Sequence, residues 1–383
     1  MKKLEKSMPV IRFKGFSEAW EQRKLGKEVE NVATGRSTFF TSIEQSSETP
    51  YAVLGSTSVI SYDKNFDHSG DFILTARVGA NAGNLYKYSG DVKISDNTVY
   101  IQAKSLDFVY YLLNKFDLKR LSFGTGQPLV KASELKNLKL MFPNDEEEQQ
   151  KIGKFFKYLD DTIALHQRKL DALKLMKKGF LQQMFPKRGE NIPKIRLDDF
   201  DDIWEQRILG EFLKESKIKG SNGSLAKKLT VKLWRKGVVP KEEIYTGSSA
   251  TQYYIRKTGQ FIYGKLDFLN QAFGIIPLEL DGYESTLDSP AFDIEESINE
   301  TFLLEYVSLV RFYKYQGNIA NGSRRAKRIH TDTFFEMPIP LPNSNEQQKI
   351  GTFSQQIDDL IALQQNKLEK ISSLKRFYLK NMF

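Results

Sequence analysis

Apolar side chains recur at alternating spacings of three and four residues in two long stretches of this chain, residues 148–185 and 346–383. Such spacing places the side chains on one face of a helix and is the register of a coiled-coil seam. We therefore predict two long helices and expect their stripes to pack on each other. The expected seam residues are Ile152, Leu159, Ile163, Leu170, Leu173, Ile350, Ile357, Ile361, Leu368 and Ile371.

Polar residues interrupt both stripes at the same two places, His166 and Lys177 in the first and Gln364 and Lys375 in the second. Polar groups in a seam lower stability but help to fix register and partner choice. One such stripe alone would be explained by packing against a neighbouring domain. Two stripes with matching interruptions favour two helices that pack on each other.

The residues ahead of the first predicted helix combine short apolar runs with one longer run of helical periodicity, which is typical of mixed α and β structure. We predict strands at 71–78, 99–103 and 137–142 and a helix at 106–116. Pro143 ends the last of these strands, and Asn144 or Asp145 can cap the helix that follows.

The second half follows the same order with different residues. A strand predicted at 259–266 parallels residues 70–77, because in both a glycine and a polar residue precede an apolar run that leads to a basic residue, Lys265 or Arg77. Residues 301–315 parallel the predicted helix of the first half, and a strand at 337–342 closes the segment. Asn343 is the expected helix cap.

Short motifs repeat around these segments. WEQRKLG at 20–26 and WEQRILG at 204–210 open the two halves, and EQQKIG begins at Glu148 and again at Glu346. The repeat period, roughly 190 residues, is far longer than the 20–50 residues of solenoid units. We predict the same α+β fold twice, with unlike loops on a common framework. The predicted divisions are two domains, each followed by a helix: 1–144, 145–192, 193–342 and 343–383.

Composition excludes several kinds of site. The chain has 383 residues, no Cys and only three His, which argues against a disulfide framework and against thiolate or His-rich metal sites. The most apolar windows, such as 301–313, contain charges and are too short to cross a membrane. No apolar run follows the basic N-terminal residues, so we expect no signal peptide and a cytoplasmic protein.

The sequence contains none of the catalytic motifs for which we searched. Residues 259–266 have the glycine spacing of a P-loop, but a leucine stands where Mg²⁺ binding requires Ser or Thr. DSPAF at 288–292 lacks the second proline of the adenine-methyltransferase motif. The pairs Asp160–Asp161 and Asp358–Asp359 do not share a helix face, so we interpret them as solvated or interface charges. We predict a non-catalytic chain.

Basic residues gather in loops at matching places of the two halves. The net charge of +9 permits nucleic-acid binding without requiring it. A basic run is usually a solvated surface, but runs in glycine-containing loops at 122–131, 321–330 and around Trp234 favour contact with phosphates or bases. The candidate DNA-binding residues are Arg36, Arg77, Lys119, Arg120, Gln127, Lys131, Lys227, Lys228, Arg235, Lys265, Arg324, Arg325, Lys327 and Arg328.

In its motifs and their order, the chain resembles the specificity (S) subunit of type I restriction–modification enzymes. The resemblance rests on the two WEQRxLG segments and on the two proline-led EQQKIG helices, and it covers essentially the whole chain. Each motif alone is weakly specific, whereas their order and spacing together are highly specific. The versions found here look like those of low-GC Gram-positive bacteria.

The resemblance implies two similar target recognition domains, related by pseudo-two-fold symmetry and separated by an antiparallel pair of coiled-coil helices. In that family each domain reads one half of a split site in double-stranded DNA, and the helices set the spacing of the halves. The helices also dock two methyltransferase (M) subunits, which bind S-adenosylmethionine. Two restriction (R) subunits, which use ATP and Mg²⁺, complete the complex, so no cofactor is expected on this chain itself.

Two other functions are compatible with the residues alone. One is a divergent DNA methyltransferase that acts by itself, and methyl transfer by the purified chain would identify it. The other is a protein-interaction scaffold with no role at DNA. Absence of DNA binding by a complex with methyltransferase subunits would favour the scaffold.

Overall fold

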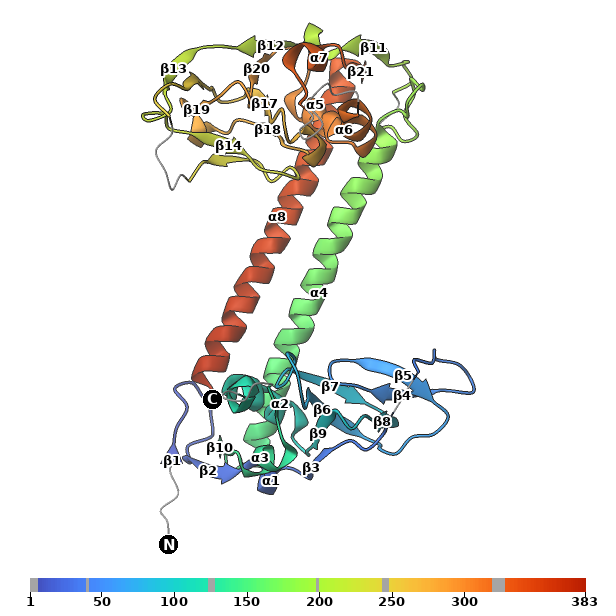
Figure 1. The fold of residues 1–383 in the computed structure, drawn as a ribbon, viewed down its shortest axis with the longest axis vertical. Coiled ribbons are helices and arrows are strands. Elements are labelled where there is room, and N and C mark those ends of the chain that lie inside the picture. Colours follow the sequence, from blue (N-terminus) through green and yellow to red (C-terminus); the bar gives the residue numbers. More distant parts are fainter. Residues whose placement is uncertain (1–5, 39–40, 123–127, 198–199, 243–247, 319–327) are drawn as a thin grey trace. The chain divides into compact units, whose positions relative to one another are not determined.

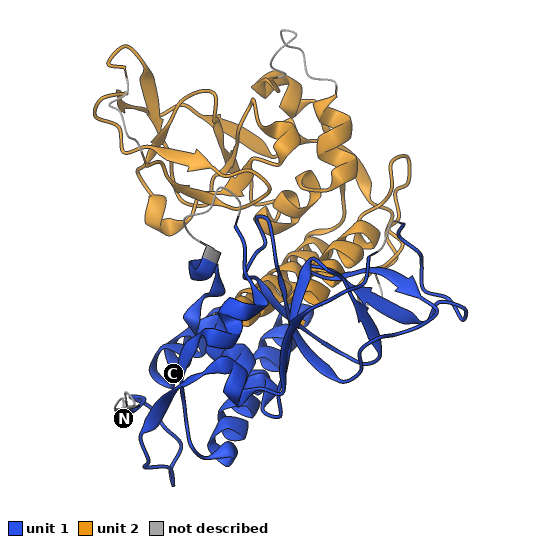
Figure 2. Ribbon diagram, turned by 60° about the horizontal axis from the view of Figure 1, so that its bottom comes forward, with its two compact units in different colours: residues 1–168, 366–383 blue, residues 169–365 orange. Residues whose placement is uncertain are grey.

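The structure is a computed structural model that describes residues 6–383 except 39–40, 123–127, 198–199, 243–247 and 319–327. The chain divides into two compact units (Figure 2). Unit 1 combines Met1–Arg168 with Asn366–Phe383, and unit 2 is Lys169–Gln365. Each unit therefore contains one predicted α+β domain and parts of both long helices.

Unit 1 is built on antiparallel sheet with one parallel strand pair (Figure 1). Its four-stranded sheet has the order β3-β9-β6-β7, and apolar side chains from β6 and β9 enter the core on both faces. The strands are β3 (Asn31–Thr34), β9 (Thr98–Gln102), β6 (Asp71–Ala76) and β7 (Leu85–Ser89), then β5 (Val59–Asp63), β4 (Tyr51–Leu54) and β8 (Val92–Ile94) in a second sheet, and β1 (Lys6–Ser7), β2 (Trp20–Lys24) and β10 (Lys139–Phe142) in a third.

The helices of unit 1 cover this framework. Helix α2 (Leu106–Phe116) buries Phe108, Tyr111 and Leu112 against it, as its periodicity predicts. Short helix α1 (Leu25–Glu28) follows β2, short helix α3 (Ala132–Asn137) precedes β10, and the 3-10 turn η1 (Leu118–Ser122) follows α2.

Unit 2 repeats this plan with shorter strands. Its four-stranded sheet has the order β12-β20-β17-β18 and carries a core rich in aromatic rings. The strands are β12 (Leu213–Ser216), β20 (Ala291–Ile294), β17 (Phe261–Tyr263) and β18 (Phe273–Ile275), with β13 (Lys219–Asn222), β16 (Gln252–Ile255) and β19 (Glu284–Ser285), the hairpin β14 (Leu229–Val231) and β15 (Val238–Pro240), and the pair β11 (Glu205–Ile208) and β21 (Pro338–Leu341).

The helical run predicted at 301–315 is divided in the structure. Helix α5 (Glu300–Val307) ends at Ser308, and helix α6 (Val310–Gly317) begins after Leu309. The hydroxyl of Ser308 donates to the carbonyl of Leu304, a bond that competes with the backbone ladder. One continuous helix was expected, so the parallel with α2 holds only for α5. Helix α7 (Thr331–Phe335) and the turns η2 (Leu209–Glu211), η3 (Phe268–Asn270) and η4 (Leu278–Leu280) complete the unit.

The two repeated segments form long helices, α4 (Glu146–Met184) and α8 (Ser344–Asn381). Both begin where the capping residues predict, since Asp145 accepts the N–H of Glu147 at 2.7 Å and Asn343 accepts that of Glu346 at 2.9 Å. No helix in the described part of the chain is long and apolar enough to cross a membrane.

The helical segments run antiparallel within each unit. In unit 1 Phe155 packs on Tyr378 and Asp160 pairs with Lys375. In unit 2 Phe180 packs on Phe353 and Lys177 pairs with Asp358. All ten expected seam residues are buried or half-buried. The two seam lysines are therefore neutralised by aspartates of the facing helix.

A buried ion pair ties the beginning of each half to its long helix. Arg12 donates twice to Glu148, at 2.6 and 2.7 Å, and Arg196 donates twice to Glu346, at 2.8 and 2.5 Å. Both glutamates belong to the repeated EQQKIG segments and are almost fully buried. Burial of both carboxylates requires a partner, and the bidentate arginines supply it.

Candidate nucleic-acid interface

The basic strand end and the glycine-led loop predicted as DNA contacts come together in both units. In unit 1 the N–H of Val130 donates to the carbonyl of Arg77 at 2.8 Å. In unit 2 the N–H of Ile329 donates to the carbonyl of Lys265 at 3.0 Å. The loops thus join their strands through equivalent backbone hydrogen bonds, although they share little sequence.

A third segment completes each arrangement. The N–H of Arg77 donates to the carbonyl of Asn97, and that of Lys265 donates to the carbonyl of Asp288, both at 2.9 Å. These bonds place the turn before β9 or β20 beside the basic strand end. We call the two arrangements edge 1, made of residues 77–78, 95–97 and 128–131, and edge 2, made of residues 265, 286–288 and 328–330.

Edge 1 gathers most of the candidates of the first half. The side chains of Arg36, Arg77, Lys119, Arg120 and Lys131 are exposed. Ser37 bridges to Ser95, so Arg36 lies at the same turn. The loop after β6 lies so close to η1 that only glycine fits at position 83. A Cβ added to Gly83 would stand 2.7 Å from the backbone nitrogen of Lys119. Gln127 lies outside the described residues.

Edge 2 presents fewer exposed charges among the residues that the structure describes. Arg328 is exposed and pairs with Asp288 at 3.1 Å, a surface pair that DNA phosphates could replace. Lys265 is half-buried, and burial lowers its pKa. Lys227 is exposed and lies just before β14. Arg324, Arg325 and Lys327 lie outside the described residues.

Two candidates are engaged by the protein itself. Lys228 is only 7% exposed, and its ammonium lies 5.3 Å from the ring centre of Tyr253. Arg235 donates to both oxygens of Glu305, at 2.5 and 3.0 Å. Sequence reasoning ranked both as DNA contacts because it could not distinguish a lysine or arginine that packs from one that is solvated. The structure favours a packing role for each.

Glu305 is the centre of a network that the sequence did not reveal. Besides Arg235, it accepts from Lys177 at 2.9 Å and from the hydroxyl of Ser354 at 2.6 Å. Burial by itself raises the pKa of Glu305, but attraction to Arg235 and Lys177, together with the hydrogen bonds from Arg235 and Ser354, outweighs it and lowers the pKa to about 2. The only sequence signal was a single carboxylate inside the apolar run 301–313.

In unit 1 the position equivalent to Glu305 holds an uncharged side chain, Tyr111. Phe108 and Phe302 pack against Trp20 and Trp204 of the repeated WEQRxLG segments, and Tyr111 and Glu305 each lie three residues further on, so Tyr111 corresponds to Glu305. The hydroxyl of Tyr111 donates to Asp160 at 2.6 Å. Burial and this bond raise the pKa of Tyr111. Each unit therefore connects its α+β domain to the paired helices, through the phenol of Tyr111 in unit 1 and the carboxylate of Glu305 in unit 2.

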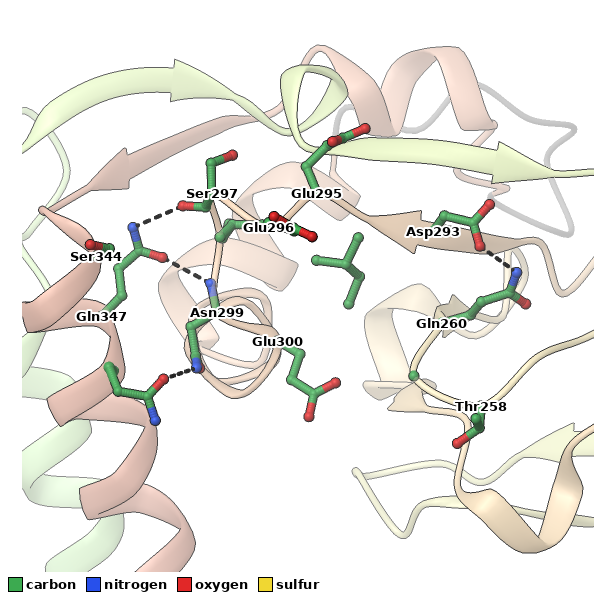
Figure 3. A pocket seen from close by; sticks show the side chains of 14 residues that line it. Thr258, Gln260, Asp293, Glu295, Glu296, Ser297, Asn299, Glu300, Ser344 and Gln347 are labelled. Carbon is green, nitrogen blue, oxygen red and sulfur yellow. Dashed lines mark hydrogen bonds between the residues drawn. The ribbon is translucent and has the colours of Figure 1, made fainter.

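A cavity of about 560 Å³ in unit 2 is a poor site for nucleic acid (Figure 3). Its lining includes the carboxylates of Asp293, Glu295, Glu296 and Glu300, which repel phosphate. Several of its polar groups are already paired, including Gln260 with Asp293 at 2.8 Å. Among the described residues no group of His, Asp or Glu side chains has the arrangement of a metal site.

Comparison with known proteins identifies relatives over most of the chain. The family described as "Type I restriction modification DNA specificity domain" matches twice, at residues 17–175 and 201–373. The type I restriction enzyme MjaVIII specificity subunit of Methanocaldococcus jannaschii is 25% identical in an alignment of 323 residues that covers 78% of this chain and 75% of that protein.

Solved structures show the same fold. The type I restriction–modification S subunit from M. genitalium superimposes with a TM-score of 0.66 at 14% identity and covers 98% of this chain and 99% of its own. A chain from a study of complex assembly and conformational transition of the type I R-M system gives a TM-score of 0.54 at 15% identity, over 95% and 97% of the two chains. The predicted fold class is confirmed.

Proposed function

Because the chain belongs to the family of type I restriction modification DNA specificity domains, we propose that it is the sequence-specificity subunit of a type I restriction–modification complex. Unit 1 and unit 2 each read one half of an asymmetric DNA site. The observation that carries this proposal is that edge 1 and edge 2 share their backbone hydrogen bonds and differ in their side chains. A common scaffold with unlike side chains is what two readers of different sequences require.

The chemistry of the edges supports base and phosphate contact. Arg77 and Lys131 at edge 1 and Arg328 at edge 2 are exposed at loops, where a cation can reach a phosphate or the edge of a guanine. The pairing of Arg328 with Asp288 is solvent-exposed, so little free energy opposes its exchange for DNA.

Methyl transfer in this proposal is supplied by separate methyltransferase subunits, which bind S-adenosylmethionine, and ATP and Mg²⁺ act on restriction subunits. Apolar residues off the seam support docking of two identical partners. Leu165 and Met176 on α4 and the equivalent Leu363 and Leu374 on α8 are 44 to 51% exposed. Identical partners suit equivalent surfaces related by two-fold symmetry.

Genome-wide mapping of methylated adenines tests the proposal. Cells that carry this chain with its methyltransferase subunit should show an asymmetric motif of two parts with an unread gap, and deletion of the chain should abolish it. An Arg77→Ala variant should relax or weaken recognition of one part only, by roughly tenfold, since a bidentate contact contributes about 1–3 kcal/mol. Lys14→Ala, an exposed change away from both edges, is the matched control.

Two outcomes would contradict the proposal. Methyl transfer to DNA by the purified chain with S-adenosylmethionine alone would make it an enzyme in its own right. An unchanged methylation pattern after deletion, with the methyltransferase subunit still present, would remove it from sequence recognition.

A further inference from the structure

The hairpin of β14 and β15 ends in a turn with unusual residues. Trp234 and Arg235 have φ angles of 59° and 54°, and Lys236 donates to the carbonyl of Leu233 at 3.4 Å. Consecutive left-handed residues are the centre of a two-residue hairpin turn, where Asn and Gly are preferred. A bulky Trp and an Arg at these two positions cost roughly 1–3 kcal/mol each.

Neighbouring segments hold the strained turn in place. The N–H of Trp234 donates to the carbonyl of Asn270 at 2.7 Å, and that of Arg235 donates to Gln271 at 3.1 Å. The guanidinium of Arg235 is fixed by the buried Glu305. Strain that the surroundings overcome in this way is typical of functional positions.

The ring that this turn presents is open to solvent. Trp234 is 55% exposed, whereas Trp20 and Trp204 are 2% and 1% exposed. It lines a groove of about 710 Å³ whose other walls include Val310 and Tyr313 and, from helix α4, Lys174 and Lys178. All of these residues belong to unit 2.

The groove carries surplus positive charge. Its carboxylates, Glu305 and Asp358, are paired with Arg235 and Lys177. Lys174 and Lys178, and Lys232 and Lys236 beside the tryptophan, are exposed, and none of the four has a salt bridge within the described ranges. Lysine is depleted from the centres of protein–protein interfaces, whereas lysines around an aromatic ring suit a phosphodiester backbone.

We propose that this groove is a second DNA contact of unit 2, in which Trp234 packs against nucleotides while Lys174 and Lys178 of α4 contact phosphates. The inference rests on the proposed function and extends it, because it assigns a DNA-binding role to the helix as well as to the recognition loops. The corresponding positions of α8 hold Ser372 and Arg376, so we expect the contact to be specific to unit 2.

The exposed tryptophan gives a direct readout. 5-Hydroxytryptophan incorporated into this chain alone is excited selectively in the complex with unlabelled methyltransferase subunits. We expect acrylamide to quench mainly residue 234, and a short duplex that carries the mapped motif should protect it. Trp234→Phe should abolish the protected component, and Trp234→Ala should lower DNA affinity roughly tenfold.

The lysines are tested through salt dependence. Affinity for DNA falls as salt rises, and the slope of log K for DNA binding against log salt concentration should become less steep by about 0.9 for Lys174→Gln. Lys178→Gln should reduce its steepness by the same amount. Lys169→Gln is the matched control, because at 100° per residue it lies on nearly the opposite face of α4 and should leave the slope unchanged.

Protection of residue 234 by DNA together with the reduced slopes would support the inference. Protection by methyltransferase subunits alone, or DNA binding that leaves residue 234 quenchable and the slopes unchanged, would overturn it without affecting the proposed function. Failure of the wild-type complex to bind any duplex would overturn both.

Discussion

At the scale of single residues, the most consequential side chain is Glu305. It is 2% exposed and accepts hydrogen bonds from three side chains that come from the β14–β15 turn, α4 and α8. Removal of one partner from such a group leaves other charges buried and unpaired, which is costly. Glu305 therefore fixes the position of the turn that carries Trp234 relative to the helices of unit 2.

The low pKa of Glu305 predicts how its contribution varies with pH. Its pKa is about 2 in the folded protein, against an ordinary value of 4.5. The carboxylate thus stabilises unit 2 fully above pH 4.5, and this stabilisation is lost as the pH falls toward 2, where the group is protonated in both states. The full effect is on the order of 3 kcal/mol.

Glu305→Gln provides the measurement. The difference in free energy of unfolding between the wild type and this variant should be largest at neutral pH and should shrink between pH 4.5 and 2. Urea unfolding followed through Trp204 reports on unit 2. Glu300→Gln, an exposed change on the same helix, is the control. A constant difference across that range would contradict the network.

At the scale of elements, the ends of the long helices are parts of the domain cores. Phe185 packs on Trp204 and Phe302, and Phe383 packs on Trp20 and Phe108. Basic side chains of the α+β domains bind backbone carbonyls at the ends of the same helices. Lys115 donates to the carbonyl of Lys380, and Arg311 donates to the carbonyls of Gln182 and Phe185. The C-terminal end of each long helix and the α+β domain that it contacts therefore form one folding unit.

This packing predicts a large effect at a helix end. Phe185 is 1% exposed, so Phe185→Ala should destabilise unit 2 by about 3–5 kcal/mol. Leu175, which is 71% exposed on α4, should change stability by about 0.5 kcal/mol or less when it is replaced by Ala. Denaturant unfolding monitored at Trp204 distinguishes the two, and equal effects would show that the helix end is not part of the core.

Some elements of the fold could be predicted from the sequence and others could not. The periodicity of 106–116 predicts α2, and proline-ended strands predict β10 and β21, because these signals are local. The break between α5 and α6 was not predicted, since it depends on a hydrogen bond of Ser308 that composition does not reveal. The pairing of Arg235 with Glu305 joins segments far apart in the sequence, so only the folded chain shows that this arginine is engaged.

At the scale of the whole molecule, the repeated framework places the same contacts in two units. The Arg–Glu pairs at the helix starts, the Lys–Asp pairs in the seam and the aromatic ends of the helices all occur twice. What differs is the side chains at edge 1 and edge 2, and the group that faces the long helices, the phenol of Tyr111 in unit 1 and the carboxylate of Glu305 in unit 2. The framework was readable from sequence because it is repeated, whereas the edges are made by loops that lack a shared pattern.

The expectation from the family resemblance that the helices set the half-site spacing predicts the effect of lengthening them. One heptad inserted in α4 after Arg168, with another in α8 after Gln365, preserves the seam register and adds about 10 Å. The gap in the methylated motif should grow by about three base pairs, at about 3.4 Å each. Methylation mapping gives the answer.

Four inserted residues in each helix would break the register and serve as the control for simple tolerance of insertions. An unchanged gap in the heptad variant, with methylation still active, would show that the helices do not measure the site.

The division of the chain into units also dictates an order of assembly during protein synthesis. Unit 2 is continuous in sequence, but unit 1 needs residues 366–383 to cover Trp20, Phe108 and Phe156. Those last residues leave the ribosome roughly 10–40 s after Arg168, at translation rates of about 5–20 residues per second. The first recognition domain to be synthesised is thus the last to be completed. Throughout that interval the faces of Trp20, Phe108 and Phe156 that Phe383 will cover stay open to chaperones and proteases, so a ribosome that stalls late leaves a chain with one finished reader.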